Sequence, residues 1–127
     1  MVIVRDLVFV YGTLRRGEVN HHLMSGAGYC GVHVTLPRYR MIHLGAYPGV
    51  VEGGSTAIVG EIYRVNGQQF TQLDRLEDYP RLYNRKLIPT PWGSAWIYTY
   101  RGVRNGRPVI PGGDWQGQQR PGPLSLY

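Results

Sequence analysis

The fold is built around residues 7–14, Leu-Val-Phe-Val-Tyr-Gly-Thr-Leu, where an apolar segment runs directly into a turn of small residues. Residues 7–11 are apolar or aromatic throughout, which predicts a buried strand. Gly12 has no side chain, so the backbone there can approach a ligand closely and can adopt a positive φ. Successive N–H groups in such a turn bind anions, and the Thr13 hydroxyl adds a donor. The stretch predicts a strand that ends at an anion-binding turn, although an ordinary strand-ending turn would look the same.

One convincing helix follows Asn66, far along the chain from this turn. The Asn66 side chain can cap the helix, and Gln69 stands three residues on, as in a capping box. Pro80 prevents the helix from continuing. Three apolar residues share one face because they are three positions apart: Phe70, Leu73 and Leu76.

Glu77 is the candidate proton carrier of this region. It follows Leu73 by four residues and therefore lies near the apolar face of the helix. Tyr79 and Tyr83 come soon after it. Because desolvation disfavours a carboxylate, we expect the pKa of Glu77 to rise toward neutrality, which suits general acid–base catalysis. The alternative is an ordinary surface glutamate.

Three other carboxylates compete with Glu77 for this role. Asp74 and Asp78 are expected to point further toward water. Glu61 is the real rival, since it lies in the middle of an expected strand. It could instead pair with an arginine such as Arg85.

The remaining sequence predicts short strands joined by turns, because 18 Gly and 9 Pro interrupt it and long helical periodicity is absent. Asn20 is expected to cap a short helix, and Gly60 marks a bulge or a close backbone approach. From Arg101 onward no regular structure is expected. The chain then divides into one domain, residues 1–115, and a flexible or docked tail, residues 116–127. The expected elements are strands at 30–36, 38–44, 56–65, 82–88 and 94–100, a helix at 21–24, and turns at 47–49 and 89–93.

Composition limits the classes of protein to consider. A chain of 127 residues forms one domain. The net charge of +6 is carried almost wholly by scattered arginines, including the pair Arg15 and Arg16, which are expected to be solvated on the surface. Nucleic-acid binding is not expected, because no RNA-reading aromatic motif or DNA-reading helix is found.

The expected location is the cytoplasm. Cys30 is the only cysteine, so no internal disulfide forms and a reducing compartment is expected. No apolar run reaches the roughly 20 residues of a membrane span, and Arg5 and Asp6 come too early for a secretory signal.

Metal, cofactor and covalent chemistry are disfavoured. His21 and His22 are adjacent and diverge, while His33 and His43 have no partner at ligand spacing. Ser94 lacks the glycine pattern of a nucleophile elbow, and no phosphate-binding loop with a lysine occurs. Cys30 is expected to be a small buried apolar residue. We therefore expect neither a metal nor a cofactor.

The motifs together resemble the gamma-glutamylcyclotransferase-like family, in particular its small single-domain branch, which includes gamma-glutamylamine cyclotransferase. The resemblance covers about residues 7–115. It is carried by residues 11–17 (Tyr-Gly-Thr-Leu-Arg-Arg-Gly), 45–49 (Gly-Ala-Tyr-Pro-Gly), 59–63 (Val-Gly-Glu-Ile-Tyr), 73–77 (Leu-Asp-Arg-Leu-Glu) and 83–85 (Tyr-Asn-Arg).

The resemblance implies an α+β fold, a compact mixed β-barrel with a few short helices and a pocket at one end. It implies that Tyr11, Gly12, Thr13 and Leu14 bind the glutamyl carboxylate through backbone N–H groups. Glu77 would occupy the catalytic position, and Tyr83 would line the pocket near it. The implied partner is a small gamma-glutamyl compound. Its cyclisation to 5-oxoproline releases an amine, and a single glutamate can move the proton that this requires.

Two other hypotheses remain open. A non-catalytic protein that binds a small anion would use the same turn without needing Glu77. An interaction module would act through the basic tail. Neither the amine leaving group nor the oligomeric state is readable from the sequence.

Overall fold

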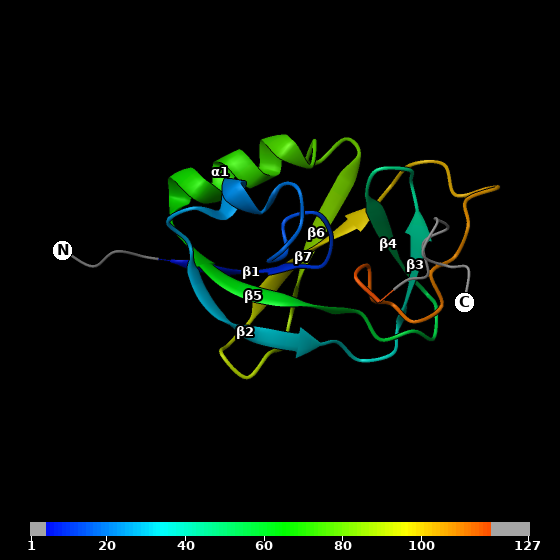
Figure 1. Cartoon of the computed structure of the whole chain (residues 1–127), viewed down its shortest axis with the longest axis horizontal. Coiled ribbons are helices and arrows are strands. Elements are labelled where there is room, and N and C mark those ends of the chain that lie inside the picture. The colour runs from blue at the N-terminus through cyan, green and yellow to red at the C-terminus, as the bar shows by residue number, and fades with distance from the viewer. Residues whose placement is uncertain (1–4, 118–127) are drawn as a thin grey trace.

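A five-stranded mixed sheet forms the centre of the molecule (Figure 1). The computed structural model describes residues 5–117. The strands lie in the order β2-β5-β1-β7-β6, and central β1 pairs antiparallel with β5 and parallel with β7. Their bounds are β1 Asp6–Val10, β2 Gly28–Val34, β5 Val59–Val65, β6 Tyr83–Ile88 and β7 Ala95–Tyr100. Because β1 lies in the middle of the sheet, with β5 on one side and β7 on the other, the turn that follows it starts from a strand that is held along both edges.

A separate antiparallel hairpin, β3 Tyr39–His43 and β4 Pro48–Glu52, lies at one end of the sheet (Figure 1). The segment after β7 runs along it, and the Ile110 N–H donates to the Met41 carbonyl at 2.8 Å. Residues 47–49 were expected to be a turn only, and β4 is a strand that the sequence did not predict. Pro48 obscured it, because proline interrupts strand patterns, yet it is tolerated as the first residue of a strand.

Helix α1, Gly67–Leu76, packs on one side of the sheet, together with the short 3₁₀ helix η1, His21–Met24 (Figure 1). The predicted capping box is confirmed: the Gln69 N–H donates to the Asn66 side chain, and the Asn66 N–H donates to the Gln69 side chain, both at 2.8 Å. Leu73 is buried, while Leu76 is half exposed. The helix ends where Glu77 forms its C-cap.

Side chains along a strand alternate between its two faces, and this alternation divides the core into two clusters. Val8 and Val10 of β1 belong to the cluster that includes Leu73 of α1, whereas Phe9 of β1 and the next residue after the strand, Tyr11, belong to the other. The residues of β7 divide between the two clusters in the same way. The first cluster contains Tyr98 and Tyr100 with Trp96 packed against it, and the second contains Ala95 and Ile97.

Gly60 is required where β5 lies beside the end of its antiparallel partner β1. A Cβ at this position would lie 2.4 Å from the Val10 carbonyl oxygen and 2.6 Å from the Phe9 ring. The close backbone approach predicted for Gly60 is therefore confirmed, and it brings Glu61 next to the residues that follow β1.

The predicted α+β class with few helices is confirmed. The strands form a curled open sheet rather than a closed barrel, because β2 and β6 stand at its two edges. As expected, residues 101–117 contain no helix or named strand. Of the predicted tail, Gln116 docks by donating from Nε2 to the Arg16 carbonyl at 2.8 Å, and residues 118–127 lie outside the described residues. No helix within residues 5–117 has the length and apolar character needed to cross a bilayer.

Candidate active site

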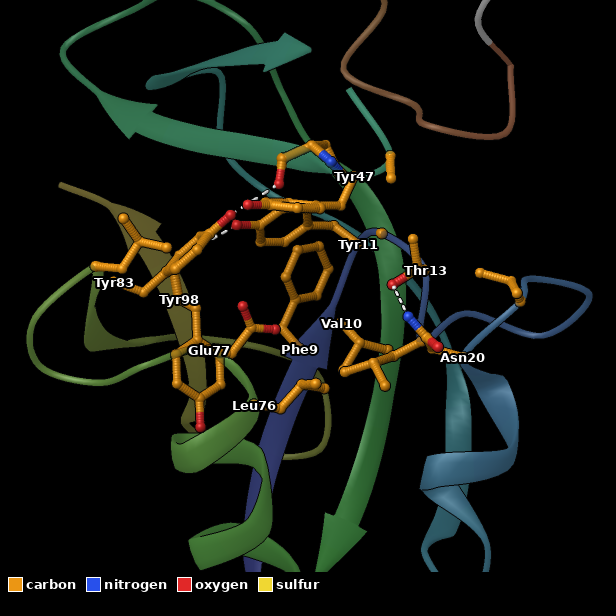
Figure 2. Close-up of a pocket in the computed structure, with 16 residues that line it drawn as sticks. Phe9, Val10, Tyr11, Thr13, Asn20, Tyr47, Leu76, Glu77, Tyr83 and Tyr98 are labelled. Atoms are coloured by element: carbon orange, nitrogen blue, oxygen red, sulfur yellow. Dashed lines mark hydrogen bonds between the residues drawn. The ribbon is translucent and has the colours of Figure 1, made fainter. Parts of the chain in front are cut away.

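A cavity of about 350 Å³ opens where the end of β1, the loop before β4 and the end of α1 converge (Figure 2). Its walls are residues 9–14, 19–20, 46–48, 76–77, 82–83 and Tyr98. All six residues predicted for the site, Tyr11, Gly12, Thr13, Leu14, Glu77 and Tyr83, line it. The structure therefore brings together two elements that are more than 60 residues apart in the chain.

The turn after β1 leaves backbone donors available to a ligand. The Arg15 N–H donates to the Gly12 carbonyl at 3.1 Å and closes the turn. Within residues 5–117, the N–H groups of Gly12, Thr13 and Leu14 have no acceptor. Gly12 does not adopt a positive φ. The turn needs glycine for another reason, because a Cβ there would lie 2.8 Å from the Pro48 ring.

Asn20 is a site residue that the sequence did not predict. Its Nδ2 donates to the Thr13 hydroxyl oxygen at 3.0 Å, so the Thr13 proton is free to be donated to a ligand. The expectation that the Asn20 side chain caps η1 is wrong, because this side chain makes no capping hydrogen bond. Asparagine side chains serve caps and turns equally well, and only the tertiary structure decides between them.

Glu77 projects its carboxylate into the cavity, toward the rings of Phe9 and Tyr11 (Figure 2). Its N–H donates to the Leu73 carbonyl at 2.9 Å, which fixes the backbone at the end of α1. The side chain itself has no hydrogen bond or ion pair with any residue of the described chain. Desolvation by burial raises the pKa of Glu77 from 4.5 to about 7, which confirms the predicted rise. Near neutral pH this carboxyl group can both accept and donate a proton.

Two tyrosines on the cavity wall remain protonated. The Tyr83 hydroxyl donates to the Pro48 carbonyl at 3.1 Å, and the Tyr11 hydroxyl donates to the Tyr98 carbonyl at 2.8 Å. Burial, and then the nearby charge of Glu77, raises the pKa of Tyr83. For Tyr11 burial again acts first, and Tyr83 and Glu77 raise its pKa further. Both hydroxyl groups therefore stay neutral beside Glu77.

Comparisons with known proteins match nearly all of the described residues. The sequence profile described as gamma-glutamyl cyclotransferase, AIG2-like, matches residues 8–117. The chain belongs to this family. A Vibrio cholerae protein named as a candidate gamma-glutamylcyclotransferase is 46% identical over 112 residues, covering 88% of this chain and 96% of that protein. The gamma-glutamylcyclotransferase family protein YtfP of Escherichia coli K12 is 41% identical over 108 residues, covering 85% and 94%.

Solved structures of family members share the fold. The solution structure of Escherichia coli YtfP has a TM-score of 0.72 at 39% identity, covering 87% of this chain and 96% of that one. The crystal structure of a mouse AIG2-like protein has a TM-score of 0.73 at 26% identity, covering 96% and 93%. The curled open sheet described above is thus the family fold.

Glu61, the rival of Glu77, does not line the cavity in this family member. It is buried and accepts hydrogen bonds from Arg15 Nε at 3.2 Å, the Arg16 N–H at 3.0 Å and the Tyr63 hydroxyl at 2.9 Å. An arginine partner was predicted, but Arg85 was the wrong one. Arg15 was expected in solvent and is only 5% exposed, because Asp114 also binds it at 2.8 Å.

Asp74 does not point toward water, which corrects the expectation. Arg85 binds it through Nε at 3.0 Å and Nη2 at 3.2 Å, and the Tyr98 hydroxyl donates to it at 2.7 Å. The Arg85 guanidinium also lies over three rings, at 4.3–4.5 Å from their centres. These rings belong to Phe70, Tyr79 and Trp96. The cluster holds the end of α1, and with it Glu77, against β6 and β7.

The other candidates have structural contacts. His21 Nδ1 lies 3.0 Å from the Leu14 carbonyl, and His33 stacks edge-on against Phe9. Cys30 is half-buried rather than buried, and Arg64 donates to its sulfur at 3.0 Å. Within the described residues, no three His, Cys, Asp or Glu side chains are grouped to hold a metal ion.

Proposed function

We propose that the protein is a gamma-glutamylcyclotransferase-type enzyme. It would convert a gamma-glutamyl amide or amine to 5-oxoproline and release the amine. One observation carries the proposal: Glu77, with its pKa raised to about 7, faces the same cavity as the free N–H groups of the Tyr11–Leu14 turn. Membership of the family and the names of its relatives support the same reading.

The turn would bind the α-carboxylate of the substrate. The N–H groups of Gly12, Thr13 and Leu14 supply donors, and the Thr13 hydroxyl, oriented by Asn20, supplies another. The Tyr83 hydroxyl already donates to Pro48, so it would accept a hydrogen bond from the substrate. Such contacts would hold the glutamyl chain folded, with its α-amine close to its γ-carbonyl, which is a proximity effect.

The proposed reaction moves two protons from the α-nitrogen to the leaving nitrogen, because the α-ammonium group has three hydrogens and the lactam nitrogen keeps one. Glu77, as carboxylate, takes a proton from the α-ammonium group, and the free amine attacks the γ-carbonyl carbon. The new C–N bond closes the five-membered lactam as the old C–N bond breaks. Glu77, now protonated, gives this proton to the leaving nitrogen as the old C–N bond breaks. Glu77 then takes the second surplus proton from the nitrogen of the new lactam and passes it to the released amine, which leaves as an ammonium group, so the enzyme ends in its starting state. A pKa of about 7 suits both steps at neutral pH.

Glu77→Gln tests the proposal most directly. The variant keeps the shape of the side chain but cannot relay a proton, so we expect kcat for 5-oxoproline release to fall by at least about 100-fold. A panel of gamma-glutamyl amines and peptides serves as substrates, and 5-oxoproline is measured by chromatography. Asp78→Asn is the matched control, because Asp78 is the next acidic residue and does not line the cavity.

Three outcomes separate the hypotheses. Loss of activity in Glu77→Gln but not in Asp78→Asn supports the proposal. Undiminished release by Glu77→Gln removes Glu77 from the mechanism. Binding of gamma-glutamyl compounds by the unaltered protein without any release would instead identify a non-catalytic protein that binds small anions through the turn.

The pH dependence of kcat/KM is a second test. Glu77 must be ionised in the free enzyme to accept the proton. Since its pKa is about 7, kcat/KM should fall roughly tenfold per pH unit below pH 7. The measurement is initial rates at low substrate concentration between pH 5 and 9. A profile that is flat between pH 5 and 8 would contradict the role of Glu77.

A further inference from the structure

The mouth of the cavity is apolar. The residues that line the cavity and are also exposed define this mouth, and Val19 is 75%, Leu76 47% and Tyr47 41% exposed. Ala46 is exposed beside them. These residues come from the loop before η1, the end of α1 and the loop before β4, so three separate segments place apolar groups at one opening. Apolar side chains gathered at the mouth of a pocket mark a surface that contacts an apolar group.

The cavity offers no partner to a charged group at this mouth. Glu77 is the only Asp, Glu, Lys, Arg or His among the described residues that line it. The buried Arg15 is occupied by Glu61 and Asp114, and the half-buried Arg85 is occupied by Asp74. A carboxylate drawn into this opening would lose water without gaining a counter-ion, which is unfavourable. An ammonium group could pair only with Glu77, which the proposed function already uses at the α-amine.

The position of the glutamyl group decides what reaches the mouth. On the proposed function, the turn holds the α-carboxylate and Glu77 faces the α-amine, so both polar ends of the glutamyl group are used inside the cavity. The substituent on the leaving nitrogen then extends toward Val19, Tyr47 and Leu76. We propose that the substituent on the leaving nitrogen is uncharged and apolar, and that these three side chains select it. The inference rests on the proposed function.

A matched set of three substrates tests the selection. Gamma-glutamyl-isoamylamide carries an apolar amine, and gamma-glutamyl-leucine has the same skeleton with one added carboxylate. Gamma-glutamyl-(4-aminobutyl)amide has instead an unbranched four-carbon chain that ends in an ammonium group. We expect kcat/KM for 5-oxoproline release from the isoamylamide to exceed that from each of the other two by at least tenfold.

The outcomes distinguish this inference from the proposed function. Equal or faster turnover of the leucine or aminobutyl compound overturns the inference and leaves the proposed function standing. Absence of 5-oxoproline from all three, together with a wider gamma-glutamyl panel, overturns both.

Val19→Arg tests the mouth itself. Val19 is largely exposed, so the substitution should not disturb folding, and the new cation would pair with the carboxylate of gamma-glutamyl-leucine. We expect kcat/KM for gamma-glutamyl-leucine, relative to the isoamylamide, to rise at least tenfold. Val103→Arg is the matched control, because Val103 is 70% exposed and does not line the cavity. The same ratio in both variants as in the unaltered protein would overturn the assignment of Val19 to the leaving group.

Discussion

Glu61 is buried and Glu77 is half-buried on the cavity wall, and the surroundings of these two glutamates differ completely. Glu61 receives three donors, one of them the Arg15 guanidinium. Glu77 receives none from the described residues and is enclosed by groups such as the Phe9 ring and Leu76. Burial with a cation and hydrogen-bond donors gives the carboxylate of Glu61 a structural role. Burial without them brings the pKa of Glu77 to neutrality, where its carboxyl group can exchange a proton.

Glu61→Gln should have the largest effect on stability. It leaves the buried Arg15 guanidinium with Asp114 as its only acidic partner, so the free energy of unfolding should fall by about 3 kcal/mol. Urea denaturation followed by circular dichroism measures this. A decrease in the free energy of unfolding below about 1 kcal/mol would mean that the Arg15–Glu61 ion pair contributes little to stability. The pair would then not be what sets Glu61 apart from Glu77.

Glu77→Gln should act in the opposite direction. Because the folded pKa of Glu77 lies above its ordinary value of 4.5, the native state binds the proton more tightly than the unfolded chain. The stability of the unaltered protein therefore falls as pH rises from about 4.5 through 7. Removing the charge should raise the free energy of unfolding by up to about 3 kcal/mol at pH 9 and by little at pH 4.

The same denaturation experiment at the two pH values checks this prediction. A destabilised Glu77→Gln variant at pH 9 would show that Glu77, like Glu61, serves the fold. Asp78→Asn should give no comparable gain, since Asp78 is partly exposed and pairs with Arg81 at the surface.

Asp114→Asn should have the smallest effect. Asp114 is the second acidic partner of Arg15, but its side chain is 34% exposed and water can replace part of the interaction. We expect a loss of about 1 kcal/mol in the free energy of unfolding. A loss of stability as large as that of Glu61→Gln would show that Asp114 and Glu61 contribute equally to balancing the buried charge of Arg15.

Local signals in the sequence predicted much of the fold. The capping box of α1 lies within four residues, and the strands of the central sheet are marked by β-branched and aromatic runs. The rise in the pKa of Glu77 was also predictable, because its distance from Leu73 along the helix places it near the apolar face. These features depend on neighbours in the chain, which a sequence displays directly.

The errors concern contacts between distant segments. Arg15 lies 46 residues from Glu61 and 99 from Asp114, and no local pattern shows which carboxylate an arginine will meet. Asp74 was misassigned for the same reason, because Arg85 and Tyr98 reach it from β6 and β7. The bond between Asn20 and Thr13 competed with a helix cap that the sequence favoured equally.

The cluster of Asp74, Arg85 and Tyr98 has a consequence for the proposed reaction. It anchors the last turn of α1 through Asp74, which lies about one helical turn before Glu77. The Glu77 carboxylate takes no part in this anchoring. Gain or loss of a proton at Glu77 therefore breaks no contact that holds the backbone. In the proposed reaction, the scaffold would therefore stay the same through each proton exchange, and no structural rearrangement would have to be reversed before the next substrate enters.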